Sequence, residues 1–194
     1  MFKYVEAKDE ELIKKIYRFR CKIACDELKV LKREDYVDGL EIDEYDRYSV
    51  HFAALDENGE VASCLRVIHH SPIGYPTENE MIVDKDLSHF QRERVGEMSR
   101  IFIRSDCRNM KDTKKIIELI KINVCPKMKE LGVDYSFGAL EKSFHRLLVM
   151  FGMPYEIIGK LQMHGGKLRY PALLSTQEFI ETNPELCAKW IVHE

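Results

Sequence analysis

The 194-residue chain lacks the features that mark several large classes of protein. Positive charge is not in excess, because 33 aspartates and glutamates outnumber 30 lysines and arginines and leave a net charge of −3. A nucleic-acid-binding domain normally shows a clear basic excess, so we expect no nucleic-acid partner. The longest uncharged apolar run covers only residues 147–155, whereas a transmembrane helix needs roughly 20 apolar residues. We therefore expect no membrane span.

Closely spaced cysteine pairs are absent as well. The six cysteines stand far apart except for Cys21 and Cys25, and no CxxC pair occurs. This arrangement favours reduced thiols over a disulfide framework. Residues 1–15 carry charges throughout and lack the apolar core of a signal peptide. Together these features predict a cytoplasmic protein.

Patterns for metal binding and covalent catalysis are weak. His69 and His70 are adjacent, so in a strand their side chains would point to opposite faces and could not bind one metal together. Cys64, Cys107 and Cys125 have no local histidine partner in the sequence. We expect neither a metal site nor a cysteine nucleophile.

What the chain does have is the composition of a folded domain, with 45% hydrophobic and 32% charged residues. Its length suffices for a full hydrophobic core, and we expect a single domain over residues 1–194. Periodicity predicts helices over residues 9–28, 112–131 and 141–151, and a last one from about Ser175. Strands are predicted over residues 48–55, 61–70, 96–104, 133–140, 155–164 and 168–172.

Turn and loop signals connect these elements. Asn58-Gly59 predicts a hairpin turn between the first two strands. Gly165-Gly166 predicts a turn across which the last two strands pair. Residues 34–46 hold seven acids and no Lys or Arg, and residues 71–80 hold two prolines and a glycine, so both predict loops. The order predicts an α/β (α+β) fold in which a mixed, mostly antiparallel sheet carries helices on both faces.

Three motifs are more specific than the order of elements. Arg20 on the first predicted helix precedes Glu-Ile-Asp-Glu-Tyr-Asp at residues 41–46, Arg66 lies in mid-strand, and residues 97–100 read Glu-Met-Ser-Arg. In this order and spacing, over about residues 15–105, the chain resembles the acyl-homoserine-lactone synthases, the autoinducer synthases of bacterial quorum sensing. Residues 147–171 look instead like the end of the N-acyl amino acid synthases and of the exosortase-associated acyltransferases.

The resemblance implies the fold of the GCN5-related N-acetyltransferases (GNAT) and an N-acyltransferase that depends on acyl carrier protein. Such an enzyme would transfer a fatty acyl group to the amine of an amino acid or an amino-acid-like acceptor. One alternative is an acyl-homoserine-lactone synthase, which acylates S-adenosylmethionine and closes the lactone. Another is a catalytically inactive ligand-binding module of the same fold. No cofactor is expected to stay bound, because the acyl-phosphopantetheine thioester of the donor is itself a substrate.

We expect acyl carrier protein as the donor in preference to acyl-CoA. Residues 104–111 contain no glycine that would let backbone N–H groups approach a pyrophosphate. Six lysines and two acids between Lys111 and Lys129 offer a docking face for an acidic carrier protein, unless they form an ordinary solvated helix face. The residues expected to contact the carrier protein or its phosphopantetheine are Arg104, Arg108, Lys111, Lys114 and Lys115.

Glu97, Ser99 and Arg100 are the candidate catalytic residues. Amide formation from a thioester needs a neutral amine and a hydrogen-bond donor for the oxyanion, and Glu97 is the candidate base. Alternatively, Glu97 is a structural carboxylate that pairs with Arg66 or Arg100. In a regular strand Glu97 and Ser99 would share one face, opposite to Arg100. We predict a β-bulge within residues 95–101 that breaks this alternation and frees a backbone N–H for the oxyanion.

Arg20, Asp43, Asp46 and Arg66 are expected to converge around the acceptor amine and to hold residues 34–46 over the cleft. The alternative is a solvated acidic loop with incidental arginines. The acyl chain needs an apolar slot between the central strands, although side chains of this kind are often simply core. The residues expected to line it are Met98, Phe102, Phe137, Leu147, Met150 and Phe151.

Overall fold

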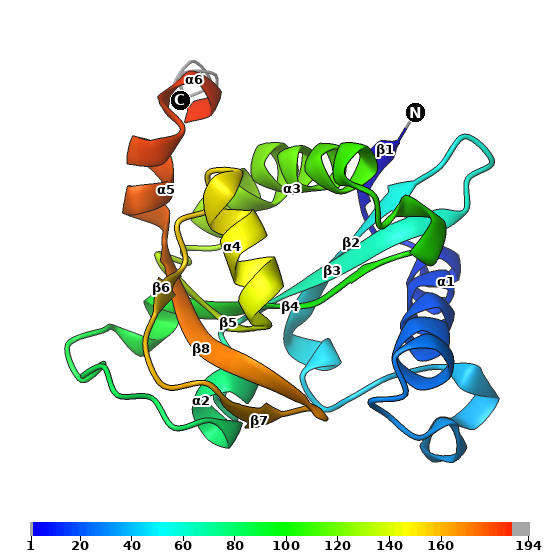
Figure 1. The fold of residues 1–194 in the computed structure, drawn as a ribbon, viewed down its shortest axis with the longest axis horizontal. Coiled ribbons are helices and arrows are strands. Elements are labelled where there is room, and N and C mark those ends of the chain that lie inside the picture. The colour runs from blue at the N-terminus through cyan, green and yellow to red at the C-terminus, as the bar shows by residue number, and fades with distance from the viewer. Residues whose placement is uncertain (1, 188–194) are drawn as a thin grey trace.

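The computed structural model describes residues 2–187, without the side chain of Cys187, so the reduced thiol expected there lies outside the described residues. The strands form one sheet in the order β1-β2-β3-β4-β5-β8-β6, with β7 paired to β8 (Figure 1). The strands are β1 (Lys3–Glu6), β2 (Ser49–Leu55), β3 (Val61–His69), β4 (Val95–Ile103), β5 (Tyr135–Leu140), β6 (Glu156–Ile157), β7 (Gln162–His164) and β8 (Lys167–Ser175). The helices are α1 (Glu10–Cys21), α2 (Pro76–Glu80), α3 (Met110–Glu130), α4 (Lys142–Met150), α5 (Thr176–Thr182) and α6 (Pro184–Cys187).

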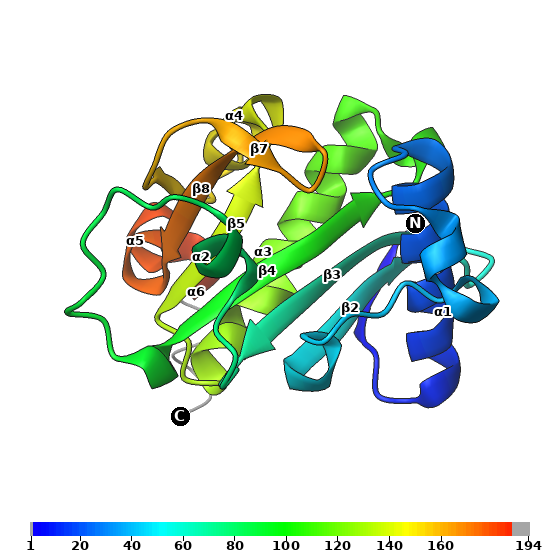
Figure 2. The ribbon, with the colours of Figure 1, turned by 90° about the horizontal axis from the view of Figure 1, so that it is seen from below.

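Helices α1 and α3 cover opposite faces of the sheet (Figure 2). The alternation along β2 shows why, because side chains of successive strand residues point to opposite faces. Phe52 and Ala54 belong to the core under α3 with Ile120, whereas Ala53 between them belongs to the core under α1 with Ile16. The strand pairs among residues 2–187 are antiparallel except β4–β5. The predicted mixed sheet with helices on both faces is therefore confirmed.

Several local predictions are confirmed. The hairpin of β2 and β3 turns at Gly59, whose φ of 77° is the left-handed conformation that glycine favours. Ser175 caps the helix that follows it by accepting a hydrogen bond from the backbone N–H of Glu178. Cys21 and Cys25 are buried free thiols. Within the described residues, no helix combines the length and the apolarity needed to cross a membrane.

Two predictions of secondary structure are wrong, and one strand was not predicted. The predicted strand 155–164 is divided into β6 and β7, because Gly159 lies so close to its neighbours that a Cβ atom there would be 2.6 Å from the carbonyl oxygen of Ile82. Residues 76–80 form α2 inside the predicted loop, with Pro76 at its first turn, where proline needs no hydrogen-bond partner for its nitrogen. The chain also begins with β1, which we did not predict.

Strands β4 and β5 separate soon after they begin. They pair in parallel over three residues only, from Val95↔Tyr135 to Glu97↔Phe137, although both strands continue further. Figure 2 shows the two arrows diverging toward their carboxyl ends. Beyond Glu97, the side chain of Ser136 accepts a hydrogen bond from the backbone N–H of Met98 at 3.0 Å. The fold therefore opens a cleft at the centre of its own sheet.

Candidate active site

The predicted β-bulge is present in β4. Cys64 of β3 pairs with Phe102 and Arg66 pairs with Ser99, so two residues of β4, Arg100 and the one after it, lie opposite a single residue of β3. Arg100 has a φ of 53°, a left-handed conformation that is uncommon for a residue with a side chain. The extra residue turns Arg100 onto the same face as Ser99. The alternation breaks as the sequence motif predicted.

Six charged residues interlock on that face; we call Arg20, Arg66, Arg100, Glu41, Asp43 and Asp46 the charge cluster. Arg20 binds Asp46 with Nη1 and Nη2, at 2.7 and 3.0 Å, and donates from Nε to Glu41. Arg66 donates to Asp43 and, at 2.8 Å, to Asp46. Arg100 donates to Glu41 and Asp43, each at 2.9 Å from Nη2. Every carboxylate of the cluster is thus held by two arginines.

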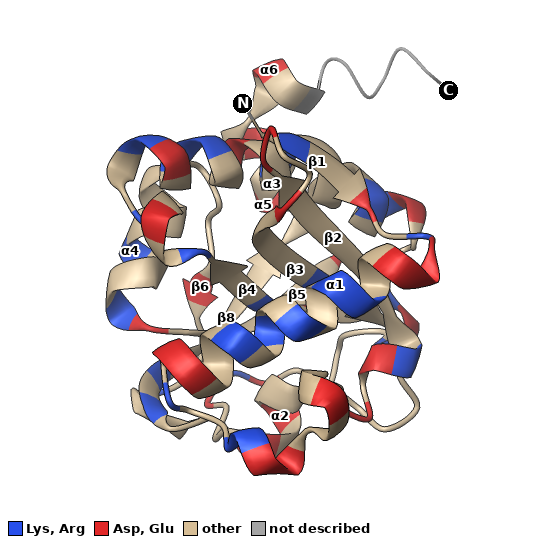
Figure 3. Ribbon diagram, turned by 90° about the vertical axis from the view of Figure 1, so that its right-hand side faces the viewer, with Lys and Arg blue, Asp and Glu red and all other residues tan. Residues whose placement is uncertain are grey.

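Pairing lets these charges remain ionised although they are buried. Arg20 is 1% exposed and Glu41 is fully buried. Burial alone would raise the pKa of Glu41 and of Asp46, but the neighbouring arginines outweigh it and both pKa values are lowered. The alternative of a solvated acidic loop is wrong for residues 41–46, which are fastened to α1, β3 and β4. Arg20 is the buried one among the basic residues that recur along α1 (Figure 3), whereas Lys14, Lys15 and Arg18 are exposed.

Glu97 lies outside the charge cluster and has different surroundings. Its side chain is 1% exposed and accepts a hydrogen bond from the backbone N–H of Thr77 at the start of α2, at 2.9 Å. Within residues 2–187 neither Arg66 nor Arg100 forms an ion pair with it, which disagrees with the alternative of a structural carboxylate paired with one of them. Burial raises the pKa of Glu97 to about 7. Ser99, two residues on, accepts a hydrogen bond from Nε of Arg66 at 2.9 Å.

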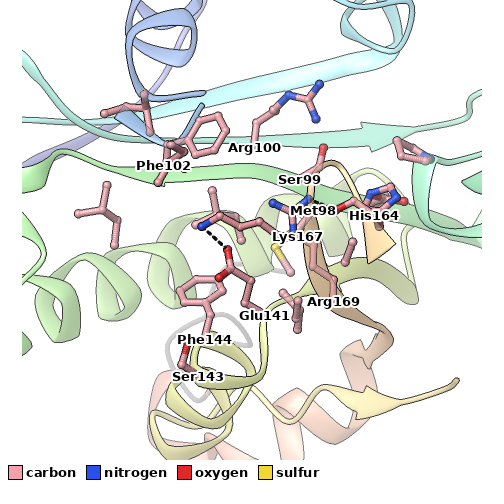
Figure 4. A pocket seen from close by; sticks show the side chains of 18 of the residues that line it. Met98, Ser99, Arg100, Phe102, Glu141, Ser143, Phe144, His164, Lys167 and Arg169 are labelled. Atoms are coloured by element: carbon pink, nitrogen blue, oxygen red, sulfur yellow. Dashed lines mark hydrogen bonds and ion pairs between the residues drawn. The ribbon is translucent and has the colours of Figure 1, made fainter. Parts of the chain in front are cut away.

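A cavity of about 370 Å³ opens between β4, β5 and β8 (Figure 4). Glu97, Ser99 and Arg100 line it together with apolar side chains of β4, β5 and α4. Of the residues expected for the acyl slot, Met98 and Phe102 line the cavity. The apolar part of the lining is Ile23, Leu28, Met98, Ile101, Phe102, Ile103, Ala139, Leu140 and Phe144.

The other four residues predicted for the acyl slot lie elsewhere. Phe137 is outside the cavity lining and packs beside Tyr75. Leu147 and Phe151 pack against the core under α3, and Met150 is 61% exposed on α4. These four residues do not line the cavity. A helical run such as 147–151 distributes its apolar side chains around the helix, and sequence alone does not say which of them faces the cleft.

The residues predicted for the donor are divided among several environments. Arg108 lines the cavity and pairs with Glu27 at 2.6 Å, while Arg104 is engaged by Asp56 and Asp106 away from the cavity lining. Lys111, Lys114 and Lys115 are exposed on the first turns of α3. Lys121, which lies within the predicted lysine face, is instead buried, and its Nζ donates to the carbonyl of Phe151 at 2.9 Å. The basic surface is therefore confined to the ends of α3.

Sequence reasoning missed several residues of the site. Glu41 was part of the acidic motif but was not singled out, although it joins Arg20 to Arg100. Thr77 donates its backbone N–H to Glu97, and Ser136 accepts a hydrogen bond from the N–H of Met98. Neither residue gives a signal in the sequence, because these contacts depend on the tertiary fold. No group of three or more His, Cys, Asp or Glu within residues 2–187 is arranged to hold a metal ion.

Comparisons with solved structures agree with the fold. The fold is similar to a CoA-dependent acyl-homoserine lactone synthase, BjaI, with SAM and isopentyl-CoA (TM-score 0.70, 18% identity, covering 96% of this chain and 89% of that one). It is similar to TofI in a ternary complex with an inhibitor and MTA (0.67, 16%, 96% and 100%) and to FeeM, an N-acyl amino acid synthase from uncultured soil microbes (0.61, 15%, 94% and 96%). No curated protein matches the chain in sequence. At these identities the likeness shows a shared fold.

The family model gives more than a fold. It describes an acetyltransferase (GNAT) domain and matches residues 19–118, which are 100 of the 194 residues. The matched segment contains the bulge of β4, Glu97 and all six members of the charge cluster. The chain belongs to the acetyltransferase (GNAT) domain family.

Proposed function

We propose that this chain is an N-acyltransferase that transfers a fatty acyl group from acyl carrier protein to the amine of an amino acid or an amino-acid-like acceptor. One observation carries the proposal: a buried carboxylate without a basic partner, Glu97, lines the cavity where β4 and β5 separate. With a pKa of about 7, Glu97 is ionised in a large fraction of molecules at neutral pH and is basic enough to accept a proton.

The proton balance of the reaction assigns Glu97 its role. An acceptor amine enters as an ammonium ion and gives one proton to Glu97, which leaves a lone pair on the nitrogen. The neutral amine then attacks the thioester carbonyl, and the C–S bond breaks as the tetrahedral intermediate collapses. The nitrogen then gives up a second proton, which the leaving thiolate takes, and Glu97 releases its own proton to solvent, so that the products are the amide, the thiol and one proton. Ser99 and Arg100, beside Glu97 in the cavity lining, polarise and orient the reacting groups.

The cleft supplies what the thioester needs. Where β4 and β5 diverge, their backbone groups no longer pair with each other, and an extended pantetheine arm fits the space left by the missing ladder. The bulge at Arg100 interrupts the ladder on the other side of β4, and a backbone N–H turned out of register there is the oxyanion donor in this proposal. Met98 and Phe102 start the apolar wall for the acyl chain.

Within the proposal, the charge cluster has a scaffolding role and binds substrate only at its exposed end. Its carboxylates are occupied by arginines, so they are not free to bind an ammonium group as the sequence motif suggested. Asp43 and Arg100 are its two partly exposed members, about one quarter exposed each, whereas Arg20 and Arg66 are buried. Because both oxygens of Asp43 are held by Arg66 and Arg100, we assign the acceptor contact to Arg100 and the fastening of residues 41–46 to the other members.

A second candidate function is synthesis of an acyl-homoserine lactone from S-adenosylmethionine. The observation that favours it is the similarity in fold to BjaI with SAM and isopentyl-CoA and to TofI with MTA. BjaI is CoA-dependent, so acyl-CoA is the alternative donor. Both functions use the same acylation step and differ in whether the acylated acceptor is released or closes a ring.

One experiment separates these possibilities. The purified protein is incubated with a set of acyl carrier protein or CoA thioesters and either mixed amino acids or S-adenosylmethionine, and products are identified by mass spectrometry. The proposal expects N-acyl amino acids from acyl carrier protein, and acyl-homoserine lactone with methylthioadenosine would establish the second candidate. Absence of any acylated product across all donors would contradict both and leave the inactive ligand-binding module.

A further inference from the structure

The hairpin of β7 and β8 brings a cation to the cavity that the steps above do not use. His164, Lys167 and Arg169 of this hairpin line the cavity together with Ser99 and Arg100 of β4 (Figure 4). Lys167 is neutralised by Glu141, with 3.1 Å between Nζ and Oε1. Nη1 of Arg169 donates to the backbone carbonyl of His164 at 3.1 Å. Within residues 2–187 no carboxylate lies within ion-pair distance of the Arg169 guanidinium.

The position of Arg169 depends on the turn of the hairpin. Gly165 has a φ of 53°, and a Cβ atom at this position would lie 2.7 Å from Nη1 of Arg169. The glycine therefore leaves room for the guanidinium to lie against the turn. Arg169 is partly buried, and burial lowers its pKa. Glu141 acts on Arg169 only from beyond ion-pair distance. A partly desolvated guanidinium that no carboxylate of residues 2–187 contacts is a strong site for an anion that can accept two of its N–H groups.

Strand register places Arg169 on the same face of the sheet as Glu97. Glu97 pairs with Phe137 and Phe137 pairs with Leu173, and residues paired in a sheet point to the same side. Arg169 lies four residues before Leu173 on β8, so its side chain points to that side as well. The base and the free cation thus belong to two walls of one cavity.

We propose that Arg169 binds the carboxylate of the acceptor, so that the acceptor is an amine that carries a carboxylate close to its nitrogen; this rests on the proposed acyl transfer. In an α-amino acid a single carbon separates the amine nitrogen from the carboxylate carbon. An amine that reaches Glu97 therefore brings its carboxylate into the same cavity. The phosphate of the donor, by contrast, lies at the far end of the pantetheine arm from the thioester and is the less suitable anion for this position.

A kinetic test compares an amino acid acceptor with its amide, which lacks the negative charge. Arg169→Gln is expected to raise the KM for the amino acid about 10- to 100-fold, the effect of losing hydrogen bonds to a charged group. The KM for the amide and the KM for the acyl donor are expected to stay as in the wild type. Arg169→Lys should recover part of the affinity, and Arg146→Gln, at an exposed position on α4, is the matched control. Equal loss toward amino acid and amide, or a rise in the donor KM alone, would overturn the proposal.

A binding test keeps this inference separate from the proposed activity. Isothermal titration calorimetry of the full chain with N-dodecanoylglycine and with N-dodecanoylglycinamide measures the contribution of the carboxylate without any turnover. The carboxylate is expected to bind about 10-fold or more tightly than the amide, and Arg169→Gln should abolish this difference. Equal affinities in the wild type, or no binding of either compound, would refute the role of Arg169 whether or not acyl transfer is found.

Discussion

Two sets of buried charge lie side by side in this molecule, and they are built on opposite principles. The charge cluster holds three arginines and three carboxylates in mutual contact. Glu97, three residues before Arg100 on the same strand, is 1% exposed and accepts a hydrogen bond from the backbone N–H of Thr77, and no arginine of residues 2–187 forms an ion pair with it. The first set keeps its carboxylates ionised with lowered pKa values at Glu41 and Asp46, whereas the pKa of Glu97 is raised to about 7.

The difference teaches which charges support structure and which are suited to chemistry. A carboxylate clamped by two guanidiniums cannot take up a proton near neutral pH, so it contributes to the fold and not to proton transfer. A buried carboxylate without a cation is costly for stability but close to the pKa that a general base requires. The bulge at Arg100 is what permits both in one strand, because it directs the arginine to the cluster and leaves Glu97 to the cavity.

Removing the unpaired carboxylate should have the largest effect. Glu97→Gln keeps the size of the side chain and an oxygen that can accept the hydrogen bond of Thr77. We expect kcat for acyl transfer to fall by about 10²- to 10⁴-fold, because general base catalysis is lost while the cavity is kept. Glu93→Gln, at an exposed position before β4, is the control. A Glu97→Gln enzyme with wild-type kcat would show that another group takes the proton.

Creating unpaired carboxylates in the charge cluster should cost stability instead. Arg20→Ala leaves Glu41 and Asp46 buried with fewer cations, and we expect a loss of about 3–5 kcal/mol in the free energy of unfolding. The control is Arg18→Ala, which removes an exposed arginine from the same helix and should change stability little. Urea unfolding monitored by circular dichroism measures both. Similar midpoints for the two variants would mean that the cluster does not stabilise the fold.

Replacing Glu97 should raise the free energy of unfolding, whereas replacing Arg20 lowers it, and the effect should be confined to a defined pH range. Its folded pKa of about 7 lies above its ordinary value of 4.5, so the unfolded chain releases this proton first as pH rises. The contribution of Glu97 to stability is therefore fully present below pH 4.5 and is lost on going to pH 7.

Relative to wild type, Glu97→Gln should gain roughly 1–3 kcal/mol of unfolding free energy between pH 4.5 and pH 8. Over the same range the kcat of the wild type should rise as pH passes through about 7, because the base must be ionised. Urea midpoints and turnover measured across the pH series test both statements. If the difference in unfolding free energy between the wild type and Glu97→Gln stayed the same at every pH, the raised pKa of Glu97 would be contradicted.

The exposed lysines of α3 should show the smallest effect. Reversing Lys114 and Lys115 to Glu is expected to raise the KM for acyl carrier protein about 3- to 10-fold and to make the reaction less sensitive to salt, since surface charges act mainly on encounter. The double variant of Lys14 and Lys15 to Glu, on the outer side of α1, is the matched control. Unchanged kinetics with the carrier protein would refute the docking face.

Much of the fold followed from local signals, and the failures share a cause. The hairpin at Asn58-Gly59, the cap at Ser175 and the β4 bulge depend on residues close in sequence or on a recognised motif, and they are confirmed. The division of 155–164 at Gly159 depends on how closely Ile82 approaches, which sequence does not reveal. The face of the 147–151 run that meets the cleft is a tertiary property for the same reason.

The candidate site divides in the same way. The motif brought together Arg20, Arg66 and Arg100, and the structure shows them in one cluster. It could not show that the arginines occupy every carboxylate of the charge cluster, nor that Glu97 lies outside the cluster. Arg169 lies about 70 residues further along the chain and reaches the cavity through the pairing of β8 with β5.

The most direct test of this account is the titration of the Glu97 carboxyl group itself, followed by ¹³C NMR in protein labelled at glutamate and aspartate side chains, with Glu97→Gln to assign the signal. The account predicts a midpoint at about pH 7 for Glu97, while the signal of Asp46 stays that of an ionised carboxylate throughout the range in which the protein is folded. A Glu97 midpoint near its ordinary value of 4.5 would contradict the claim that burial without a cation makes this residue the base.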